Sequence, residues 1–283
     1  MSKIYKSSRK GFPGGFTVLM AVYHKEDPYR FKQALESIFS NTLLPDQVIL
    51  VVDGPVPEYL DNIITDTEQR SELFSVYRLS QNRGLAEALN MGLAYVETEW
   101  VVRADSDDIN KFDRFEKQAA AIADISSSVD IIGGAIREID YDGTPLAIRR
   151  TVENDSDIRD FVRRRNPFNH MTVAFRLDIV RKVGGYPNIF LKEDYALWAL
   201  LIHAGARCMN LPDVLVDATT GREMYGRRGG LKYAMAEVEL QRHLVSLNIK
   251  SLSHAVFDGI ARSIVFLMPP FFRALVYKRL LRS

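Results

Sequence analysis

The feature that most constrains the fold is a series of short apolar runs that alternate with helix-like segments. These runs have strand length and are rich in β-branched and aromatic residues, which is the pattern of buried β-strands. They span residues 16–23, 48–52, 74–79 and 100–104. Asp27 and Pro28 supply a helix N-cap and a proline at the first helical position, and a second amphipathic helix begins after Gly84. This order predicts an α/β fold with a Rossmann-like, mostly parallel twisted sheet and helices on both faces.

The fourth apolar run ends in a dense acidic cluster. Asp105, Asp107 and Asp108 follow it directly, and the ligand crevice of an open α/β sheet lies outside the carboxyl ends of its strands. Carboxylates this close repel one another, and a Mg²⁺ or Mn²⁺ ion shared with diphosphate oxygens would relieve that repulsion. We therefore take Asp107 as a metal ligand. An Asp-rich turn that caps the next helix explains the same residues without a metal.

Polar residues also follow the three other runs. Tyr23 to Glu26 follow the first run, Asp53 the second, and Asn82 to Gly84 the third. A crevice that collects acids from different strands beside a glycine turn suits a nucleotide diphosphate, because Asp53 can accept from base or ribose donors and Gly84 permits close backbone approach. Singly, Asp53 suits the start of a Gly-Pro turn equally well. The shared position of these residues at strand ends favours binding.

The second half of the sequence is less regular than the first. It predicts a helix over 112–123, a strand over 129–139, a hairpin turn at 140–143, a charged helix over 155–165, a short strand over 171–175, and helices over 195–203 and 229–247. No repeat or low-complexity linker interrupts these elements. We therefore expect one domain of two fused halves.

Composition excludes several classes of protein. The 283 residues are 47% hydrophobic and 26% charged, which is typical of a globular protein with a sizeable core. A net charge of +1 argues against a general nucleic-acid binder. The single cysteine, Cys208, excludes an internal disulfide and fits a reducing compartment. Residues 1–10 lead into no signal peptide and no run is long enough to span a membrane, so we expect a cytoplasmic protein.

The last segment differs in charge from the rest of the chain. Beyond Asp258 it contains no acidic residue, and its arginines and lysines are interspersed with apolar and aromatic residues. Basic amphipathic segments of this kind lie in the interface of anionic membranes. The pattern favours a peripheral position on the cytoplasmic face of the inner membrane. A helical pair that packs on the domain, with solvated arginines and lysines, is the alternative.

Taken together, the motifs resemble a known family. In order, the chain carries VLMAVYHKED, VVDG, QNRGLAEALNMGL, RADSDD and KEDYALW. This set resembles the family 2 inverting glycosyltransferases of the GT-A fold, and more narrowly the bacterial enzymes that build O-antigen or exopolysaccharide repeat units. The resemblance covers residues 16–240. It implies a divalent metal, a UDP-sugar donor and single displacement with inversion, with galactose or glucose passing to a lipid-diphosphate-linked oligosaccharide.

The resemblance also implies roles for individual residues. The positions that match the donor-binding motifs are Tyr23, Glu26, Asp53, Arg83, Gly84 and Asp105. The first three would contact the uridine, the next two would line the nucleotide pocket, and the last would contact the ribose or the sugar. Asp107 would hold the metal, and Asp194 would be the general base. The expected organisation is an N-terminal extension at 1–15, a nucleotide-sugar-binding half at 16–110, an acceptor-binding half at 111–250, and a basic helical tail at 251–283.

Three further positions have alternative interpretations. Arg227, which lies with two other arginines in GREMYGRRGG, either adds donors to the diphosphate or belongs to a solvated loop. Glu193 and His170 are candidates for contact with the acceptor sugar. A satisfied, partly buried histidine is the simpler interpretation of His170, which as a base is second to Asp194.

Two other classes of protein share part of this pattern. A sugar-phosphate nucleotidylyltransferase also combines a Rossmann-like sheet with acidic metal ligands, but it would carry a glycine-rich loop after the first strand, where this chain reads Ala21-Val22-Tyr23-His24-Lys25. A non-catalytic nucleotide-sugar-binding protein would keep the crevice without needing both Asp107 and Asp194.

Overall fold

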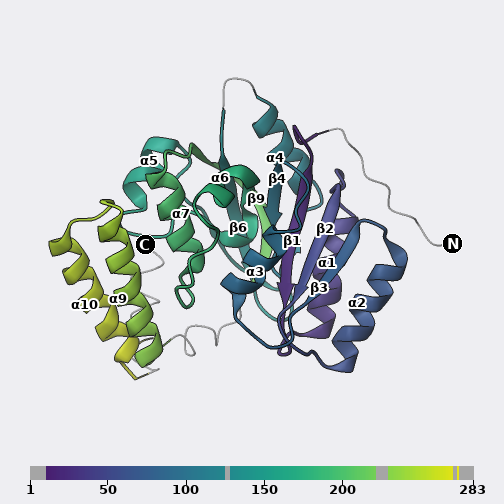
Figure 1. The fold of residues 1–283 in the computed structure, drawn as a ribbon, viewed down its shortest axis with the longest axis horizontal. Helices are drawn as coiled ribbons and strands as arrows, with labels where there is room; N and C mark the ends of the chain where they lie inside the picture. The colour runs from purple at the N-terminus through teal and green to yellow at the C-terminus, as the bar shows by residue number, and fades with distance from the viewer. Residues whose placement is uncertain (1–10, 125–127, 221–228, 270–272, 274–283) are drawn as a thin grey trace.

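A single mixed sheet organises the molecule. The computed structural model describes residues 11–124, 128–220, 229–269 and 273 (Figure 1). Its strands are β1 (Phe16–Val22), β2 (Gln47–Val52), β3 (Phe74–Arg78), β4 (Trp100–Arg103), β5 (Ile109–Asn110), β6 (Ile131–Ile139), β7 (Pro145–Arg149), β8 (Ala174–Arg176) and β9 (Cys208–Thr219). Within the described residues they form one nine-stranded sheet in the order β3-β2-β1-β4-β8-β6-β9-β5, and β7 pairs with β6 outside this path.

The strands predicted from the four apolar runs, β1 to β4, pair with one another in parallel. β1 lies between β2 and β4, β3 pairs with β2, and all of these pairs are parallel. β6 and β9 run in the same direction as β4, whereas β5, β7 and β8 run against it. The predicted mostly parallel sheet is therefore confirmed, and its antiparallel strands, β5, β7 and β8, come after β4 in the chain.

Helices cover both faces of the sheet, as predicted. They are α1 (Pro28–Phe39), α2 (Glu58–Arg70), α3 (Leu85–Leu93), α4 (Arg114–Ala123), α5 (Asp155–Phe161), α6 (Leu177–Lys182), α7 (Glu193–His203), α9 (Leu231–Ser246) and α10 (Leu252–Leu267). In β1, Val18 and Met20 pack with α1, α2 and α4, whereas Leu19 and Ala21 pack with α3, α6 and α7 on the other face. Because successive side chains of a strand point to opposite faces of the sheet, β1 contributes residues to two separate hydrophobic cores.

The strand predicted at 171–175 is wrong in its first half. A 3-10 turn spans His170–Thr172, and only Ala174–Arg176 pair with β4 and β6. The Thr172 hydroxyl donates to the carbonyl of Asn169 at 2.8 Å and accepts the N–H of Gly134 at 3.0 Å. A threonine that is favourable in a strand is thus used to close a turn.

β9, the longest strand among the described residues, was not predicted from the sequence. β9 is parallel to β6, but the register shifts between them: Gly134 pairs with Leu211, and the next residue, Ala135, pairs with Val214. Pro212 and Asp213 lie in this bulge and interrupt the apolar pattern that identifies other strands.

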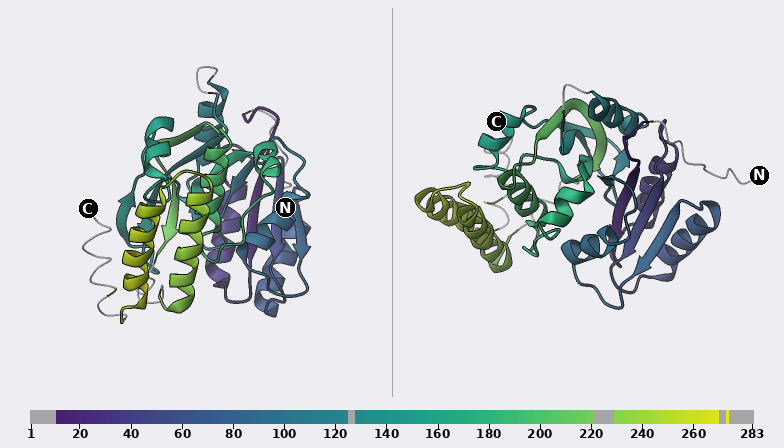
Figure 2. Two further views of the ribbon diagram at one scale, coloured as in Figure 1. Left: turned by 60° about the vertical axis from the view of Figure 1, so that its left-hand side comes forward. Right: turned by 45° about the horizontal axis from the view of Figure 1, so that its top comes forward.

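The predicted helical tail begins as α10, which packs against α9 at one side of the molecule (Figures 1 and 2). Ala255, Gly259 and Phe266 of α10 are buried. Among the described residues, no helix is both long and apolar enough to cross a membrane. The rest of the predicted tail, apart from residues 268, 269 and 273, and residues 1–10 of the predicted N-terminal extension lie outside the described residues.

Candidate functional site

The structure gathers four of the predicted site residues around the end of β4. Asp105 and Asp107 follow this strand, and Tyr23 and Glu26 lie in the loop between β1 and α1. The Ser106 hydroxyl donates a hydrogen bond to the carboxylate of Glu26 and so joins the two loops. The pKa of Tyr23 is raised by burial and by the charges of Glu26 and Asp107. These residues form one acidic group at the edge where the parallel strands end.

Excess negative charge is the main electrostatic property of this acidic group. Burial, with the charges of Asp105 and Glu26, raises the pKa of Asp107 to about 7. Burial also raises the pKa of Glu26. Arg30, in the first turn of α1, acts in the opposite direction on the pKa of Asp107. Added positive charge would therefore stabilise the ionised form of this site.

The donor set fits a hard divalent cation. Asp107 and its acidic neighbours offer carboxylate oxygens, which suit Mg²⁺ and Mn²⁺. Within the described part of the chain, no three His, Cys, Asp or Glu side chains form a complete metal site. Mg²⁺ usually takes one or two carboxylates and completes its shell with substrate phosphates and water. The residues thus fit a metal that binds together with a nucleotide diphosphate, with Asp107 as a ligand.

Two buried arginines adjoin the acidic group, and the sequence analysis did not identify them. Arg103 ends β4, is 1% exposed, and forms an ion pair with Asp105. Arg114 of α4 is fully buried and donates from Nη2 to the carbonyl of Arg103 at 2.9 Å. Burial and the charge of Arg103 lower the pKa of Arg114 to about 9. An arginine inside an apolar run, between Val102 and Ala104, is the sequence signal that points to this position.

Asp108 stabilises the fold through a hydrogen bond to the end of β9. Its carboxylate accepts the N–H of Thr219 at 2.9 Å, and the Thr219 hydroxyl donates to the carbonyl of Asp107 at 3.1 Å. Burial and the charges of Asp107 and Asp105 raise the pKa of Asp108 well above its usual value. The end of β9 is thereby fastened to the loop that carries Asp107.

Asp53 forms a second predicted part of the site, together with Arg83 and Gly84. One carboxylate oxygen of Asp53 accepts the N–H of Arg83 at 2.7 Å, and the other accepts the N–H of Gly84 at 2.9 Å. The side chain of Asn82 donates to the carbonyl of Asp53 at 3.2 Å. We call this set of bonds the Asp53 bracket. The carboxylate predicted to contact uridine therefore already accepts two hydrogen bonds from the protein. Each of its oxygens retains a further lone pair that can accept a hydrogen bond from a ligand.

Gly84 is required by its backbone conformation rather than by crowding. Its φ is 91°, a left-handed value that favours glycine. A Cβ built at this position meets no atom within 4 Å. The space beside the Gly84 backbone before α3 is therefore open.

The predicted base lies in the first turn of α7. One carboxylate oxygen of Asp194 accepts the N–H of Tyr195 at 2.7 Å, and the other accepts from Asn166 Nδ2 at 2.6 Å. Burial raises the pKa of Asp194. Glu193 is 7% exposed, and burial with the charge of Asp194 raises its pKa to about 7. The charge of Asp105 raises the pKa of both residues, so the pair lies within electrostatic reach of the acidic group.

His170 has the surroundings of a partly buried, satisfied histidine. Its Nε2 lies 3.1 Å from the hydroxyl of Tyr186, and its ring contacts Trp198 edge-on. Burial and the charge of Arg103 lower the pKa of His170 well below its usual value. The imidazole is therefore neutral at physiological pH, which suits a hydrogen-bonding role. Arg227 and the two arginines near it lie outside the described residues.

Sequence comparison identifies bacterial relatives along nearly the whole chain. UDP-Gal:alpha-D-GlcNAc-diphosphoundecaprenol beta-1,3-galactosyltransferase of Escherichia coli is 38% identical over 270 residues, which cover 94% of this chain and 96% of the relative. The amylovoran biosynthesis glycosyltransferase AmsE of Erwinia amylovora is 38% identical over 254 residues, covering 90% and 94% respectively. These relatives are glycosyltransferases of bacterial polysaccharide biosynthesis.

Structural and family comparisons agree with this result. The mannosyltransferase PcManGT of Pyrobaculum calidifontis, solved with GDP-Man and Mn²⁺, superposes with a TM-score of 0.57 at 19% identity and covers 98% of this chain and 74% of its own. This likeness confirms the predicted GT-A fold. The family model described as glycosyl transferase family 2 matches residues 17–184. This protein is therefore an enzyme that belongs to glycosyltransferase family 2.

Proposed function

We propose that this enzyme transfers galactose or glucose, with inversion, from a UDP-sugar to a lipid-diphosphate-linked oligosaccharide in cell-surface polysaccharide synthesis. The observation that carries the proposal is the proximity of two unlike acidic sites. Asp107 belongs to a charge-rich group suited to a metal and a diphosphate. Asp194 is a buried carboxylate on another element, within electrostatic reach of Asp105. The E. coli relative, named for a UDP-Gal donor and a diphosphoundecaprenol-linked acceptor, supports the choice of substrates.

The positions of these groups support a division of the chain into two functional halves. We assign donor binding to residues 16–110, which carry the acidic group and the Asp53 bracket, and acceptor binding to residues 111–250, which carry Asp194, Glu193 and His170. The donor-binding residues are Tyr23, Glu26, Asp53, Arg83, Gly84 and Asp105. Arg227, in the segment before α9, is assigned to the diphosphate.

In the proposed reaction, Asp194 takes the proton from the acceptor hydroxyl. The acceptor oxygen forms a bond to the anomeric carbon while the bond to the diphosphate oxygen breaks, and its electron pair leaves with UDP. A Mg²⁺ or Mn²⁺ ion, bound by Asp107, would stabilise the charge on the leaving diphosphate as a Lewis acid. The raised pKa of Asp194, caused by burial, makes its carboxylate a stronger base than an exposed aspartate.

The test is transfer from UDP-galactose and UDP-glucose to GlcNAc-diphosphoundecaprenol, with Mn²⁺ and with EDTA. We expect UDP release and a lengthened lipid-linked product with one donor, and at least a tenfold loss of rate in EDTA. An α-linked donor should yield a β-linked product, which NMR coupling constants identify. Release of pyrophosphate from UTP and a sugar phosphate would instead indicate a nucleotidylyltransferase. Saturable UDP-sugar binding without turnover would indicate a non-catalytic protein.

We also propose that the enzyme works on the cytoplasmic face of the inner membrane, held there in part by α10. This helix packs on α9, as the alternative interpretation of the tail required, yet it keeps a row of large apolar side chains exposed. These are Leu252, Val256, Phe257, Ile260, Ile264 and Leu267. Apolar side chains of a helix that lies in a membrane interface penetrate the acyl boundary. The row thus offers a lipid contact that does not require α10 to leave the domain.

The paired substitution Phe257→Glu and Ile260→Glu should reduce sedimentation of the protein with anionic vesicles. Each exposed side chain that enters the bilayer contributes roughly 1.5–3 kcal/mol, so the expected loss of binding is at least about tenfold. Phe112→Glu is the matched control, because Phe112 is 67% exposed and Phe257 is 72% exposed. Equal sedimentation of the wild-type and doubly substituted proteins would remove α10 from the membrane contact.

A further inference from the structure

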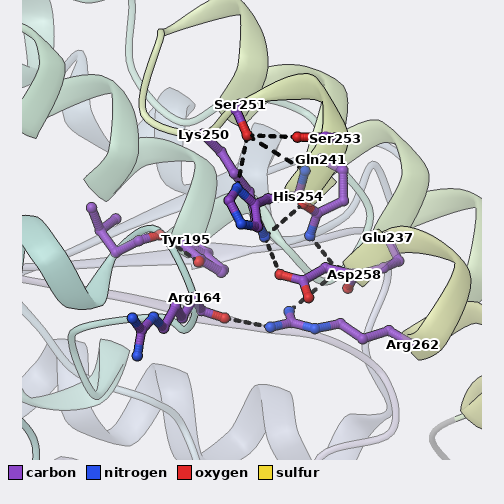
Figure 3. A network of polar contacts seen from close by, with 11 residues as sticks. Arg164, Tyr195, Glu237, Gln241, Lys250, Ser251, Ser253, His254, Asp258 and Arg262 are labelled. Atoms are coloured by element: carbon purple, nitrogen blue, oxygen red, sulfur yellow. Dashed lines mark hydrogen bonds and ion pairs between the residues drawn. The ribbon is translucent and has the colours of Figure 1, made fainter. Parts of the chain in front are cut away.

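A buried carboxylate in the C-terminal helices faces the turn that carries the proposed base. Glu237 of α9 is fully buried. It lies far along the chain from the acidic group around β4 and is not part of it. Its Oε1 accepts from Gln241 Nε2 at 2.8 Å and lies 3.2 Å from Arg262 Nη1 of α10 (Figure 3). Its Oε2 lies 3.1 Å from Lys192 Nζ. One carboxylate therefore links α9, α10 and the residue that directly precedes α7.

Lys192 is the N-cap residue of α7 and is followed immediately by Glu193 and Asp194. Its side chain is 21% exposed, and its ammonium group lies 5.5 Å from the centre of the Phe266 ring. The side chain thus extends from the catalytic turn into the contact between α7 and the α9–α10 pair. Contacts that fix the position of Lys192 therefore also restrict the backbone at the start of α7, which positions Asp194.

The charges in this contact are balanced around Glu237. Burial by itself raises the pKa of Glu237, but the charges of Lys192 and Arg262 outweigh burial, and the pKa lies below its usual value. The carboxylate is therefore ionised at neutral pH. Removal of one partner from such a buried group leaves the other charge uncompensated.

The helix that carries Glu237 is itself firmly placed. Leu240 and Leu244 of α9 belong to the same buried core as α7. Nε2 of His243 donates to the carbonyl of Ala196, in α7, at 3.1 Å. Arg262 continues the network by donating to the carbonyl of Arg164 (Figure 3). Glu237 is thus a fixed point on the domain rather than a group on a loosely attached helix.

We infer that Glu237 is a positioning residue for the catalytic turn: through Lys192 it fixes the start of α7 and hence the carboxylate of Asp194. This inference rests on the proposed role of Asp194 as the base. It makes the α9–α10 pair part of the catalytic apparatus, although neither helix contributes a group that touches the reacting atoms.

The test compares Glu237→Gln, Lys192→Met and Lys192→Arg in the transfer assay. Displacement of a catalytic group by about 1 Å can cost on the order of 10²-fold in rate, so we expect kcat to fall by about 10–100-fold in the first two variants. The KM for UDP-galactose should stay within about twofold of wild type, because neither residue is among those assigned to the donor. Lys192→Arg retains the cation and should recover most of kcat. Lys192→Met leaves Glu237 paired with Arg262, so the test does not depend on the folding of Glu237→Gln.

Asp258→Asn is the matched control. Asp258 of α10 pairs with the buried Lys250, which also donates to Gln241 at 3.0 Å, so this ion pair belongs to the same network, but among the described residues it forms no hydrogen bond or ion pair with α7. The control should lower the melting temperature while kcat stays near wild type. A kcat loss in Asp258→Asn equal to that in Lys192→Met would reduce Glu237 to a general stabiliser and overturn the inference.

Asp194→Asn, measured alongside, separates this inference from the proposed function. An inactive Asp194→Asn variant with unchanged kcat in Lys192→Met and Glu237→Gln would overturn the positioning role alone. An active Asp194→Asn variant would overturn the assigned base, and with it the target of the positioning.

Discussion

Replacement of Asp194 by asparagine is expected to lower kcat for sugar transfer by about 10²–10⁴-fold, the usual contribution of general-base assistance. The substitution keeps the size of the side chain but removes the basic oxygen. The acceptor hydroxyl then has no adjacent group to take its proton as the new bond forms. Binding of UDP-galactose, measured by calorimetry, should remain near wild type, because Asp194 is not among the residues assigned to the donor.

The structure adds a detail to this experiment. An oxygen of Asp194 accepts from Asn166 Nδ2 at 2.6 Å, so an amide at position 194 brings two N–H₂ groups face to face unless one of them rotates. The loss of stability from one such contact is about 1–3 kcal/mol, which thermal unfolding will register. A variant that keeps more than about a tenth of wild-type turnover, far above the range expected for a lost base, would contradict the assignment. Glu193→Gln and His170→Ala in the same assay would then identify the base.

Asp107→Ala should abolish both transfer and the metal-dependent part of UDP binding. Asp107 is the residue in the acidic group whose pKa is raised to about 7 by burial and by the charges of Asp105 and Glu26. Without its carboxylate, the site loses the ligand that would hold a cation against the diphosphate, and the diphosphate meets the remaining acids uncompensated. Calorimetric titration of UDP with and without Mn²⁺ measures this effect directly.

The folded state should survive this substitution, because removal of one charge from a repulsive cluster creates no core defect. UDP binding in EDTA provides the internal control, and it should be equally weak in the wild-type and Asp107→Ala proteins. If Mn²⁺ strengthens UDP binding to the same extent in both proteins, the metal is held elsewhere.

The elements that the sequence predicts well are those whose signal is local. β1 and β2 consist almost entirely of buried apolar residues, so a run of strand length suffices to identify them. The α1 N-cap is equally local, since Asp27 accepts the N–H of Arg30 at 3.0 Å. β9 is different, because its bulge at Pro212 and its pairing with β6 depend on residues more than seventy positions earlier.

The same distinction applies to the site. The positions of Asp105 and Asp107 at a strand end follow from the order of strands, and the structure places them together with Tyr23 and Glu26. The sequence does not show that Asp108, one residue further on, bonds to Thr219. It also does not show that Arg103 is buried against the acids, because arginine is exposed at most positions in proteins. The pairing of Asp108 with Thr219 joins segments that are distant in the sequence and has no local pattern.

The Asp53 bracket has a consequence for affinity. A loop that is disordered before binding loses conformational entropy when it closes on a ligand, at roughly 1–2 kcal/mol for each backbone residue that becomes fixed. The loop from Asn82 to Gly84 is tied to Asp53, at the end of β2, by three hydrogen bonds, and all three are made within the protein itself. Its shape is set during folding, so the entropy of ordering it is not subtracted from the binding of each donor molecule. In the proposed reaction, which releases UDP after every turnover, the enzyme can thus rebind donor without refolding this loop.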